Sequence, residues 1–362
     1  MTFIKSRKHP ASSSLKAATL FTSLALALPA LATQPGDNAE PQVSNAKNLP
    51  GVRVEAATSG DYRVDALSSA KFTESLLDTP QTVTVISKDL FQEQGATTLT
   101  EALRNSAGVG TFYVGENGST STGDAVNMRG FDSSGSIFVD GVRDLGTISR
   151  DVFNTEQVEV TKGPDGTEYG RTSPTGAINM VSKQPLLGQG TSASVSYGSA
   201  QQKRATADWN QQLGASSALR LNVMGQNSGV PGRDEVKNDR WGIAPSLAFG
   251  LGTPTRVYLD YLHVKQSNVP DGGVPTIGLP GYTSPDATRP FLDAAPGVDS
   301  RHFYGTAQDH DDVTADMFTA IVEHDFSPAV ALHNTLRWGR TQQDYLLTSC
   351  RFAALNMNEV SR

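Results

Sequence analysis

Apolar and polar residues alternate along the second half of the chain. In residues 219–223, for example, Leu219, Leu221 and Val223 would share one face, and Arg220 and Asn222 the other. A period of two is that of a β-strand whose two faces meet different surroundings. The same alternation recurs in seven segments: residues 192–199, 204–213, 218–226, 241–250, 255–265, 314–326 and 330–345. We therefore expect seven to eight antiparallel strands between residues 187 and 347.

The connections between these segments alternate in length. Residues 214–217, 251–254 and 327–329 are short, whereas residues 229–239 and 266–312 are longer and polar. Short turns at one end of the strands and long loops at the other are typical of a transmembrane β-barrel. Aromatic residues near the strand ends suit an interfacial girdle, namely Trp209, Trp241, Phe249, Tyr258 and Phe326. A soluble β-sandwich also has period-two strands, but the segregation of loop lengths favours the barrel.

Residues 70–186 show a different, α+β pattern. Residues 82–87 read as a strand, and Ser87 is placed to cap a helix over residues 88–94 that stops at Gly95. A second short helix is expected over residues 98–105. Further strands are expected around residues 127–129, 136–139, 157–161 and 177–182. This stretch predicts a compact mixed domain in front of the strands.

The first 32 residues have the pattern of a secretory signal. Four cations, Lys5, Arg7, Lys8 and Lys16, precede an apolar stretch near residues 20–28 and a small-x-small site ending at Ala32. A transmembrane helix is disfavoured, because spanning needs about 20 apolar residues. Cleavage would remove four cations and no acids, taking the formal charge from -7 to -11. Such a charge argues against a nucleic-acid partner, and the single cysteine excludes an intramolecular disulfide.

Residues 33–69 form a polar N-terminal extension, expected to be flexible. Within it lies a short β-prone segment that a partner strand could pair with: Leu49, Pro50, Gly51, Val52, Arg53 and Val54. An ordinary linker is the alternative interpretation.

Several motifs in the α+β stretch resemble the plug domain of TonB-dependent receptors. Residues 79–86 with 99–103 resemble its opening, residues 128–131 with 137–143 its middle, and residues 158–164, 169–171 and 176–183 its closing motif. Residues 115–118 and 271–281 are similar, more narrowly, to catecholate siderophore receptors. The resemblance runs from about residue 50 to residue 347, and the tail 348–362 departs from it. Since a plugged transporter barrel has about 22 strands, the chain is expected to hold the plug and only a truncated part of an outer-membrane β-barrel.

The resemblance implies uptake of ferric catecholate siderophores across the bacterial outer membrane. The protein would reach that membrane by Sec-type export. Its implied partners are the TonB–ExbB–ExbD complex, which would pull on residues 49–54, the ferric siderophore, and outer-membrane lipid and lipopolysaccharide. The negative charge predicts no nucleic-acid partner, and the absence of a Ser-His-Asp or paired-carboxylate pattern predicts no enzymatic activity. No cofactor is expected, because the iron complex is cargo. The alternatives are a nonfunctional receptor fragment, or a docking surface for phage or colicin.

A polyanionic, aromatic ligand calls for cations and aromatic rings on outward-facing loops. Phe112 and Tyr113 precede a Gly-rich loop and suit the aromatic role, and Arg143 and Arg150 suit the cationic role. The alternative for the rings is burial in the plug core. For each arginine it is a surface ion pair with Asp144 or Asp151.

The remaining motif positions are expected to be structural. They are Arg129, Gly130, Asp140, Gly141, Lys162, Gly163, Pro164, Tyr169, Gly170 and Arg171. Residues 162–167 lack the Gly-Lys-Ser/Thr ending of a phosphate loop. Arg129 and Arg171, with Glu159 and Glu168, are expected to form ion pairs between plug and barrel wall. The acids near residues 309–312 are expected in a long outer loop, without a metal site.

Overall fold

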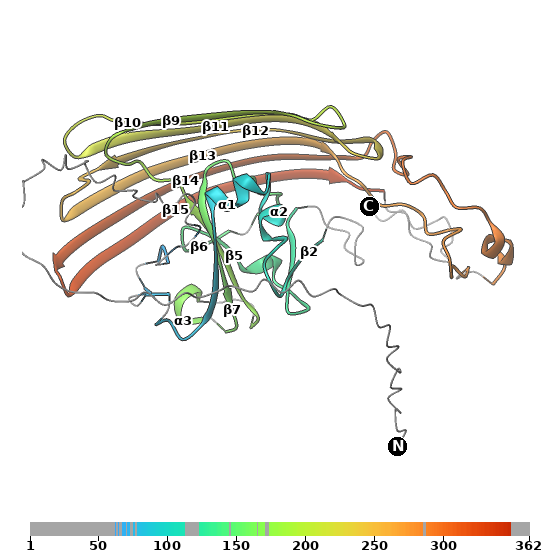
Figure 1. Cartoon of the computed structure of the whole chain (residues 1–362), viewed down its shortest axis with the longest axis horizontal. Helices are drawn as coiled ribbons and strands as arrows, with labels where there is room; N and C mark the ends of the chain where they lie inside the picture. Colours follow the sequence, from blue (N-terminus) through green and yellow to red (C-terminus); the bar gives the residue numbers. More distant parts are fainter. Residues whose placement is uncertain are drawn as a thin grey trace, which may run out of the picture. The chain divides into compact units, whose positions relative to one another are not determined.

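The architecture comes from a computed structural model. It describes residues 62, 64, 67–69, 71–72, 75–76, 78–112, 123–144, 146–164, 166–170, 174–284 and 287–348, all within the unit formed by residues 57–362. Within these residues an α+β plug is followed by a seven-stranded antiparallel sheet, here called the wall (Figure 1). No helix in the described part of the chain is long and apolar enough to cross a membrane.

The plug is built on two small sheets. The five-stranded sheet has the order β1-β7-β8-β5-β6 and comprises β1 (Thr82–Ser87), β5 (Ile137–Val139), β6 (Val142–Arg143), β7 (Thr155–Lys162) and β8 (Gly176–Ser182). The three-stranded sheet comprises β2 (Val109–Phe112), β3 (Ala125–Met128) and β4 (Phe131–Asp132). Its helical segments are α1 (Lys88–Glu93), α2 (Leu99–Leu103), η2 (Ser134–Ser136) and α3 (Gly166–Tyr169).

Local side-chain contacts explain why the two short helices start where they do. The Ser87 hydroxyl accepts the N–H of Leu90 at 3.4 Å, which confirms the predicted cap of α1. At α2, Thr98 and Glu101 form a capping box in which each side chain accepts the other residue's backbone N–H. Gly95 ends the first helix with a φ of 67°, a conformation that costs glycine little.

The plug has an apolar core of its own. Side chains from α1, α2 and both sheets are buried together, including Phe91, Leu99, Leu103, Met128 and Ile178. Every member of this cluster lies between residues 86 and 180. The core therefore depends on no residue of the wall.

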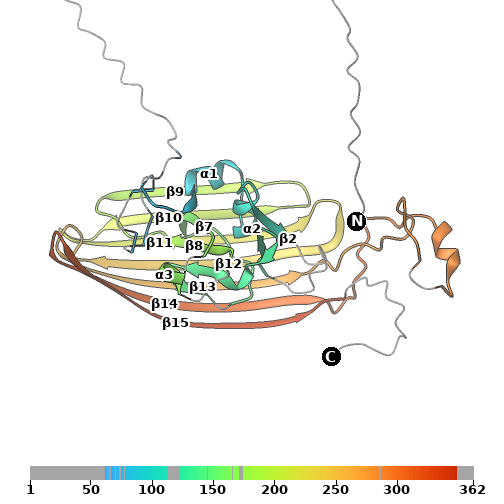
Figure 2. The ribbon, with the colours of Figure 1, turned by 90° about the horizontal axis from the view of Figure 1, so that it is seen from below.

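The wall is a meander in which each strand pairs with its sequence neighbours (Figure 2). Its strands are β9 (Gln189–Tyr197), β10 (Lys203–Gln212), β11 (Ser217–Val230), β12 (Arg233–Phe249), β13 (Thr255–Val269), β14 (His310–Ser327) and β15 (Val330–Leu346). The edge strands β9 and β15 do not pair with each other, so the sheet is open within the described residues. The structure thus confirms the plug followed by a partial barrel.

The two faces of the wall differ as the alternation predicts. Along β11, Arg220, Asn222 and Met224 are buried on the face toward the plug, and the residues between them point away. The large apolar side chains that remain exposed include Trp209, Trp241, Phe249, Phe326, Leu336 and Trp338. Tyr258 departs from the predicted girdle, because it pairs with the fully buried Ala248 and so lies on the plug-facing side.

Two predicted boundaries of the wall were wrong. Residues 229–239 do not form a long loop: β11 runs to Val230, β12 starts at Arg233, and only a two-residue turn joins them. Likewise β14 starts at His310, so Asp311 and Asp312 lie in a strand rather than in the outer loop. In both places the strand is polar on both faces, which hides the alternation. The long connection that remains, residues 270–309, contains η3 (Pro290–Ala294).

Candidate functional site

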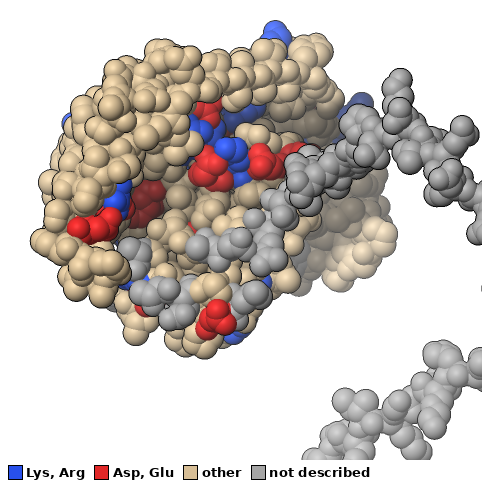
Figure 3. Space-filling view, turned by 60° about the vertical axis from the view of Figure 1, so that its left-hand side comes forward, with Lys and Arg blue, Asp and Glu red and all other residues tan. Residues whose placement is uncertain are grey.

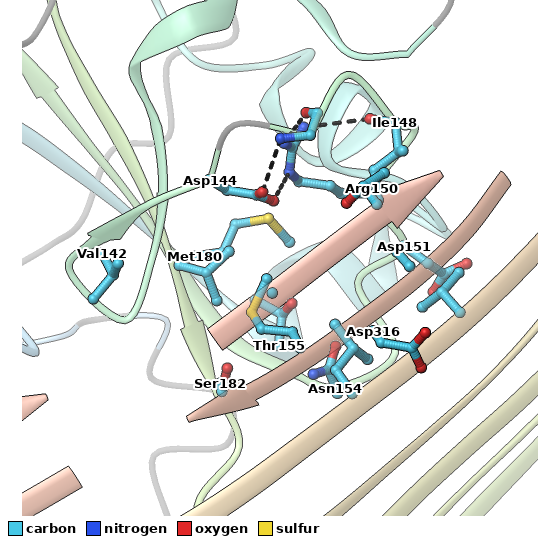
Figure 4. Close-up of a pocket in the computed structure, with 18 of the residues that line it drawn as sticks. Val142, Asp144, Ile148, Arg150, Asp151, Asn154, Thr155, Met180, Ser182 and Asp316 are labelled. Atoms are coloured by element: carbon cyan, nitrogen blue, oxygen red, sulfur yellow. Dashed lines mark hydrogen bonds and ion pairs between the residues drawn. The ribbon is translucent and has the colours of Figure 1, made fainter. Parts of the chain in front are cut away.

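A cavity of about 460 Å³ lies between the plug and the wall. The plug lines it with the β5–β6 hairpin and with residues around 144–155, and the wall lines it with β13, β14 and β15 (Figure 4). Two of the predicted ligand-binding residues, Arg143 and Arg150, are among the lining residues. The topology therefore brings both predicted cations to one cavity.

The Arg150 guanidinium donates hydrogen bonds to four groups of the plug. Its Nε donates to Asp144 Oδ2 at 2.9 Å, and its Nη1 donates to Asp124 Oδ2 at 3.0 Å. The carbonyls of Gly146 and Ile148 accept from its Nη2 and Nη1 at 2.6 and 3.3 Å. The side chain is only 6% exposed, so the Asp144 pairing considered from the sequence is present but buried rather than on the surface.

These contacts fix the charge of Arg150 and the path of the loop before it. Burial alone would lower the pKa of the Arg150 guanidinium, but the carboxylates of Asp144 and Asp124 outweigh it and raise that pKa above its ordinary value. The guanidinium remains charged and ties the backbone of residues 146 and 148 to two strand-end acids. Arg150 therefore organises the loop that borders the cavity.

Of the other three predicted ligand residues, only Arg143 has a described side chain. Arg143 is exposed, and its guanidinium donates to the carbonyl of Gly135, with Nε at 2.7 Å. Phe112 ends β2, but its side chain lies outside the described part of the structure, as does all of Tyr113.

Buried ion pairs join the plug to the wall. The Asp151 carboxylate accepts two hydrogen bonds of 2.7 Å from Arg204 on β10. Arg240 on β12 approaches the same carboxylate, with Nε 3.1 Å from Oδ2. The Asp151 side chain is 1% exposed, so one plug acid pairs with two wall cations away from solvent.

A second group of ion pairs joins the plug to β15 and to another position on β10. Asp140 accepts from Arg337 Nη2 on β15 at 3.1 Å. Lys183, at the end of the plug, lies 3.0 Å from Asp208 on β10, and burial lowers the pKa of its ammonium group. Arg220 on β11 holds Asp208 through two hydrogen bonds of 2.9 and 2.8 Å.

The motif residues Asp140 and Gly141 form the tight turn of the β5–β6 hairpin. Their φ values are 48° and 74°, the left-handed pair that a type I′ turn requires. The Asp140 carboxylate also accepts the N–H and hydroxyl of Ser182, at 2.7 and 2.8 Å. The turn thus aims Asp140 at both the end of β8 and the wall.

The remaining motif residues lie within the plug. The ring of Tyr169 packs against Phe138 with centroids 4.7 Å apart. Lys162 Nζ donates to Thr84 Oγ1 at 3.2 Å, and partial burial, with Arg129 nearby, lowers the pKa of its ammonium group. Positive φ values occur at Arg129, Gly130, Gly163 and Gly170, while Pro164 is exposed.

The predicted plug–wall pair of Glu159 was wrong. Glu159 is fully buried inside the plug, where it accepts from Ser68 N at 2.6 Å, Gln157 Nε2 at 2.7 Å and Asn179 Nδ2 at 2.9 Å. Glu168 contributes its backbone carbonyl to a contact with Lys71. Plug–wall pairing does exist, but Asp151, Asp140 and Lys183 provide it.

Some predictions fall on residues outside the described structure. These are the signal segment, residues 349–362 of the predicted tail, Arg171, and the predicted TonB-binding segment Leu49, Pro50, Gly51, Val52, Arg53 and Val54. Among the described residues, no group of three or more side chains is arranged to hold a metal ion.

Comparisons with known proteins agree with this architecture. Residues 75–177 match the family described as TonB-dependent Receptor Plug Domain. The chain is 54% identical over 306 residues to the Catecholate siderophore receptor Fiu of Escherichia coli (strain K12), a match covering 84% of this chain. It is 34% identical over 304 residues to the Probable TonB-dependent siderophore receptor PiuA of Acinetobacter baumannii, covering 83% of this chain.

The solved structures give the same picture. The open form of Fiu from E. coli K12 has a TM-score of 0.74 and 53% identity, over 79% of this chain and 42% of that one. The siderophore receptor PiuA from Acinetobacter baumannii has a TM-score of 0.70 and 34% identity, over 78% of this chain and 40% of that one. The chain spans 40% of the length of both curated relatives.

Proposed function

Because this chain carries a TonB-dependent receptor plug domain followed by wall strands like those of Fiu, we propose that it takes part in the uptake of ferric catecholate siderophores across the bacterial outer membrane. The observation that carries the proposal is the 54% identity to the Catecholate siderophore receptor Fiu over 306 residues. That likeness covers both the plug and the wall. The iron complex is cargo in this proposal, so the protein acts as a receptor without enzymatic activity or a resident cofactor.

The described contacts support a closed resting state. The plug packs against the wall through buried ion pairs at Asp140, Asp151 and Lys183. A ligand could pass only after such contacts part, which requires an energy input. In the proposal the TonB–ExbB–ExbD complex supplies it by pulling on residues 49–54, whose extended, β-prone sequence suits strand pairing.

The location follows from the same proposal. The chain is exported by a Sec-type route, cleaved after Ala32 and inserted in the outer membrane among lipid and lipopolysaccharide. The exposed apolar side chains on the outer face of the wall, such as Leu336 and Trp338, would meet lipid.

The proposed ligand residues are Phe112, Tyr113, Arg143 and Arg150. Arg143 is exposed at the cavity and is available for direct contact once its bond to Gly135 is exchanged. Arg150 is held by two carboxylates, so its contribution would pass through the loop that it organises. This division makes Arg143 a contacting residue and Arg150 a positioning residue.

Uptake of ⁵⁵Fe complexed to a catecholate siderophore tests the proposal. Residues 1–347 are joined to the remaining strands of Fiu and expressed in a strain that lacks its own catecholate receptors. We expect uptake that depends on TonB and is abolished when residues 49–54 are deleted. Intact Fiu is the positive control. Surface expression of the chimera without any binding of the ferric complex would overturn the proposal.

A further inference from the structure

The plug-facing side of the wall carries four buried arginines. They are Arg204 on β10, Arg220 on β11, Arg240 on β12 and Arg337 on β15, and each side chain is less than a tenth exposed. Arg220 has an acid on the wall itself, Asp208. The carboxylates paired with Arg204, Arg240 and Arg337 belong to the plug. The wall thus relies on the plug for part of its charge balance. Figure 3 shows cationic and acidic side chains gathered together in the hollow of the molecule.

Arg204 and Arg240 form the better-built site of this set. The register places Arg204 opposite Gln226 and Gln226 opposite Arg240, so the three side chains lie in one row across β10, β11 and β12. Gln226 Oε1 accepts from both guanidiniums, at 2.8 and 3.0 Å. Both arginines then converge on Asp151, which fills the space between them.

This arrangement is an anion site whose present occupant is a plug side chain. Two guanidiniums oriented by a shared amide form charge-assisted bonds with any carboxylate or similarly charged oxygen anion. If the plug moves, Asp151 leaves with it, whereas Gln226 stays on the wall and keeps both cations in place. Without Asp151, two adjacent guanidiniums would face the lumen with no counter-charge, so an anion would be attracted to the position that the carboxylate leaves.

A second arginine further along the wall, Arg337, would also lose its carboxylate partner if the plug moved. Arg337 lies in the row formed with Thr319, Asp260 and Ser246, and Ser246 is six residues from Arg240 on β12. Six residues of strand correspond to about 20 Å. Arg337 loses its carboxylate partner when Asp140 departs. Two acids on this face keep partners on the wall itself, because Asp260 accepts from the Ser246 hydroxyl on β12 and Asp311 accepts from Gln343 at 2.7 Å.

We propose that the wall arginines Arg204 and Arg240 form a transit site, which binds the anionic iron complex briefly during its passage. In the resting state the Asp151 carboxylate occupies this site in place of the iron complex. Arg337 forms a second site of the same kind further along the wall, occupied in the resting state by Asp140. The inference rests on the proposed function, since a ferric catecholate is a polyanion. The same residues therefore hold the plug before it moves and attract the cargo after it moves.

The experiment separates holding the plug from attracting the cargo. In the chimera with Fiu, Asp151→Asn removes the carboxylate and leaves both arginines. The triple change Asp151→Asn, Arg204→Gln, Arg240→Gln removes the ion pairs and the cations together. Lys203→Gln is the matched control, because Lys203 lies next to Arg204 on the opposite, exposed face of β10. The readout is the maximal rate of ⁵⁵Fe-catecholate uptake at saturating ligand.

We expect the triple variant to transport about tenfold more slowly than Asp151→Asn, since two charge-assisted contacts are lost. Lys203→Gln should match the parent. Equal rates in the triple variant and Asp151→Asn would overturn the transit site and leave a purely mechanical role. A parent chimera that transports nothing would instead contradict the proposed function. If the triple variant does not reach the surface, Asp151→Asn with Arg204→Gln replaces it, with an intermediate rate expected.

Discussion

Arg150 shows how one side chain serves the plug and the cavity at once. The sequence predicted Arg150 as a ligand-binding cation, because a polyanionic ligand calls for cations on outward-facing loops. Its burial was not predictable, since Asp124 lies 26 residues away along the chain and meets Arg150 only in the folded plug. The pairing with Asp144, six residues away, was within reach of sequence reasoning.

Replacing Arg150 with alanine should therefore affect stability as well as binding. Asp124 and Asp144 would remain buried without a cation, which costs roughly 3–5 kcal/mol. Binding of the ferric catecholate by the chimera should weaken by about 10- to 100-fold, as the charged hydrogen bonds that hold the loop are lost. Urea unfolding measures the first effect, and fluorescence quenching by the ferric complex measures the second.

Arg143→Ala is the matched comparison for Arg150→Ala. Arg143 lines the same cavity but is exposed and pairs with a carbonyl rather than a carboxylate. Its removal should weaken binding and leave the free energy of unfolding nearly unchanged. A large loss of stability in Arg143→Ala, or none in Arg150→Ala, would contradict this assignment of roles.

Phe112→Ala should cost less in binding than either arginine change. A ring in contact with the ligand contributes on the order of 1 kcal/mol. Calorimetric titration with the ferric catecholate measures the loss. A neutral hydroxamate complex, if the receptor accepts one, should bind equally well to the Phe112 and Arg150 variants. Unchanged catecholate affinity in the variants at both positions would move the site to the loop of residues 270–309.

At the scale of elements, alternation predicted all seven wall strands but not their polar ends. The missed residues around 227–240 are polar on both faces, with Asn227, Ser228 and Asp239 among them, and such a strand leaves no period-two signal. In the plug, the longer strands and both helices were predicted from β-branched runs and capping residues. The two-residue strands β4 and β6 pair with β3 and β5 across two-residue turns, and the helix α3 has four residues; elements this short leave no hydrophobic period to recognise.

Gly176 is a position in a plug strand where substitution should be poorly tolerated. It begins β8 with a φ of 139°, and a Cβ there would lie 2.0 Å from the carbonyl oxygen of Thr161 on the paired strand β7. Gly176→Ala should lower the free energy of unfolding by roughly 2–5 kcal/mol through backbone strain and steric overlap. Urea unfolding of the full chain measures the change.

Gly130→Ala is the control for that prediction. Gly130 also has a positive φ, 86°, but a Cβ there would meet no atom within 4 Å. Its replacement should cost only the backbone term, about 1–2 kcal/mol. Equal losses in the two variants would mean that the close approach of β7 to Gly176 has no energetic weight.

At the scale of the whole molecule, the order of plug and wall was predictable and the contacts between them were not. The motifs and the alternation fixed which segment belongs to which part. Which plug acid meets which wall arginine depends on the docking of surfaces far apart in sequence, such as Asp151 with Arg204 and Arg240. This is why Glu159, an acid in a recognisable motif, was assigned to the wall although it completes a hydrogen-bond network inside the plug.

The separation of the two parts leads to a final prediction, that residues 70–186 fold without the wall. The plug core lies entirely between residues 86 and 180, and the apolar clusters shared with the wall take only Phe153 and Ile148 from the plug. Ion pairs and hydrogen bonds also cross the boundary between the described residues, and water can solvate those groups once the wall is absent. Amide exchange of the isolated segment should show protected N–H groups in β1 at residues 83–86 and in β7 at residues 158–161, where the two strands pair in register. The same amides in the full chain provide the reference. Uniformly fast exchange in the isolated segment would show that the plug needs the wall to fold, and that the ion pairs at Asp140, Asp151 and Lys183 stabilise the plug itself as well as its docking.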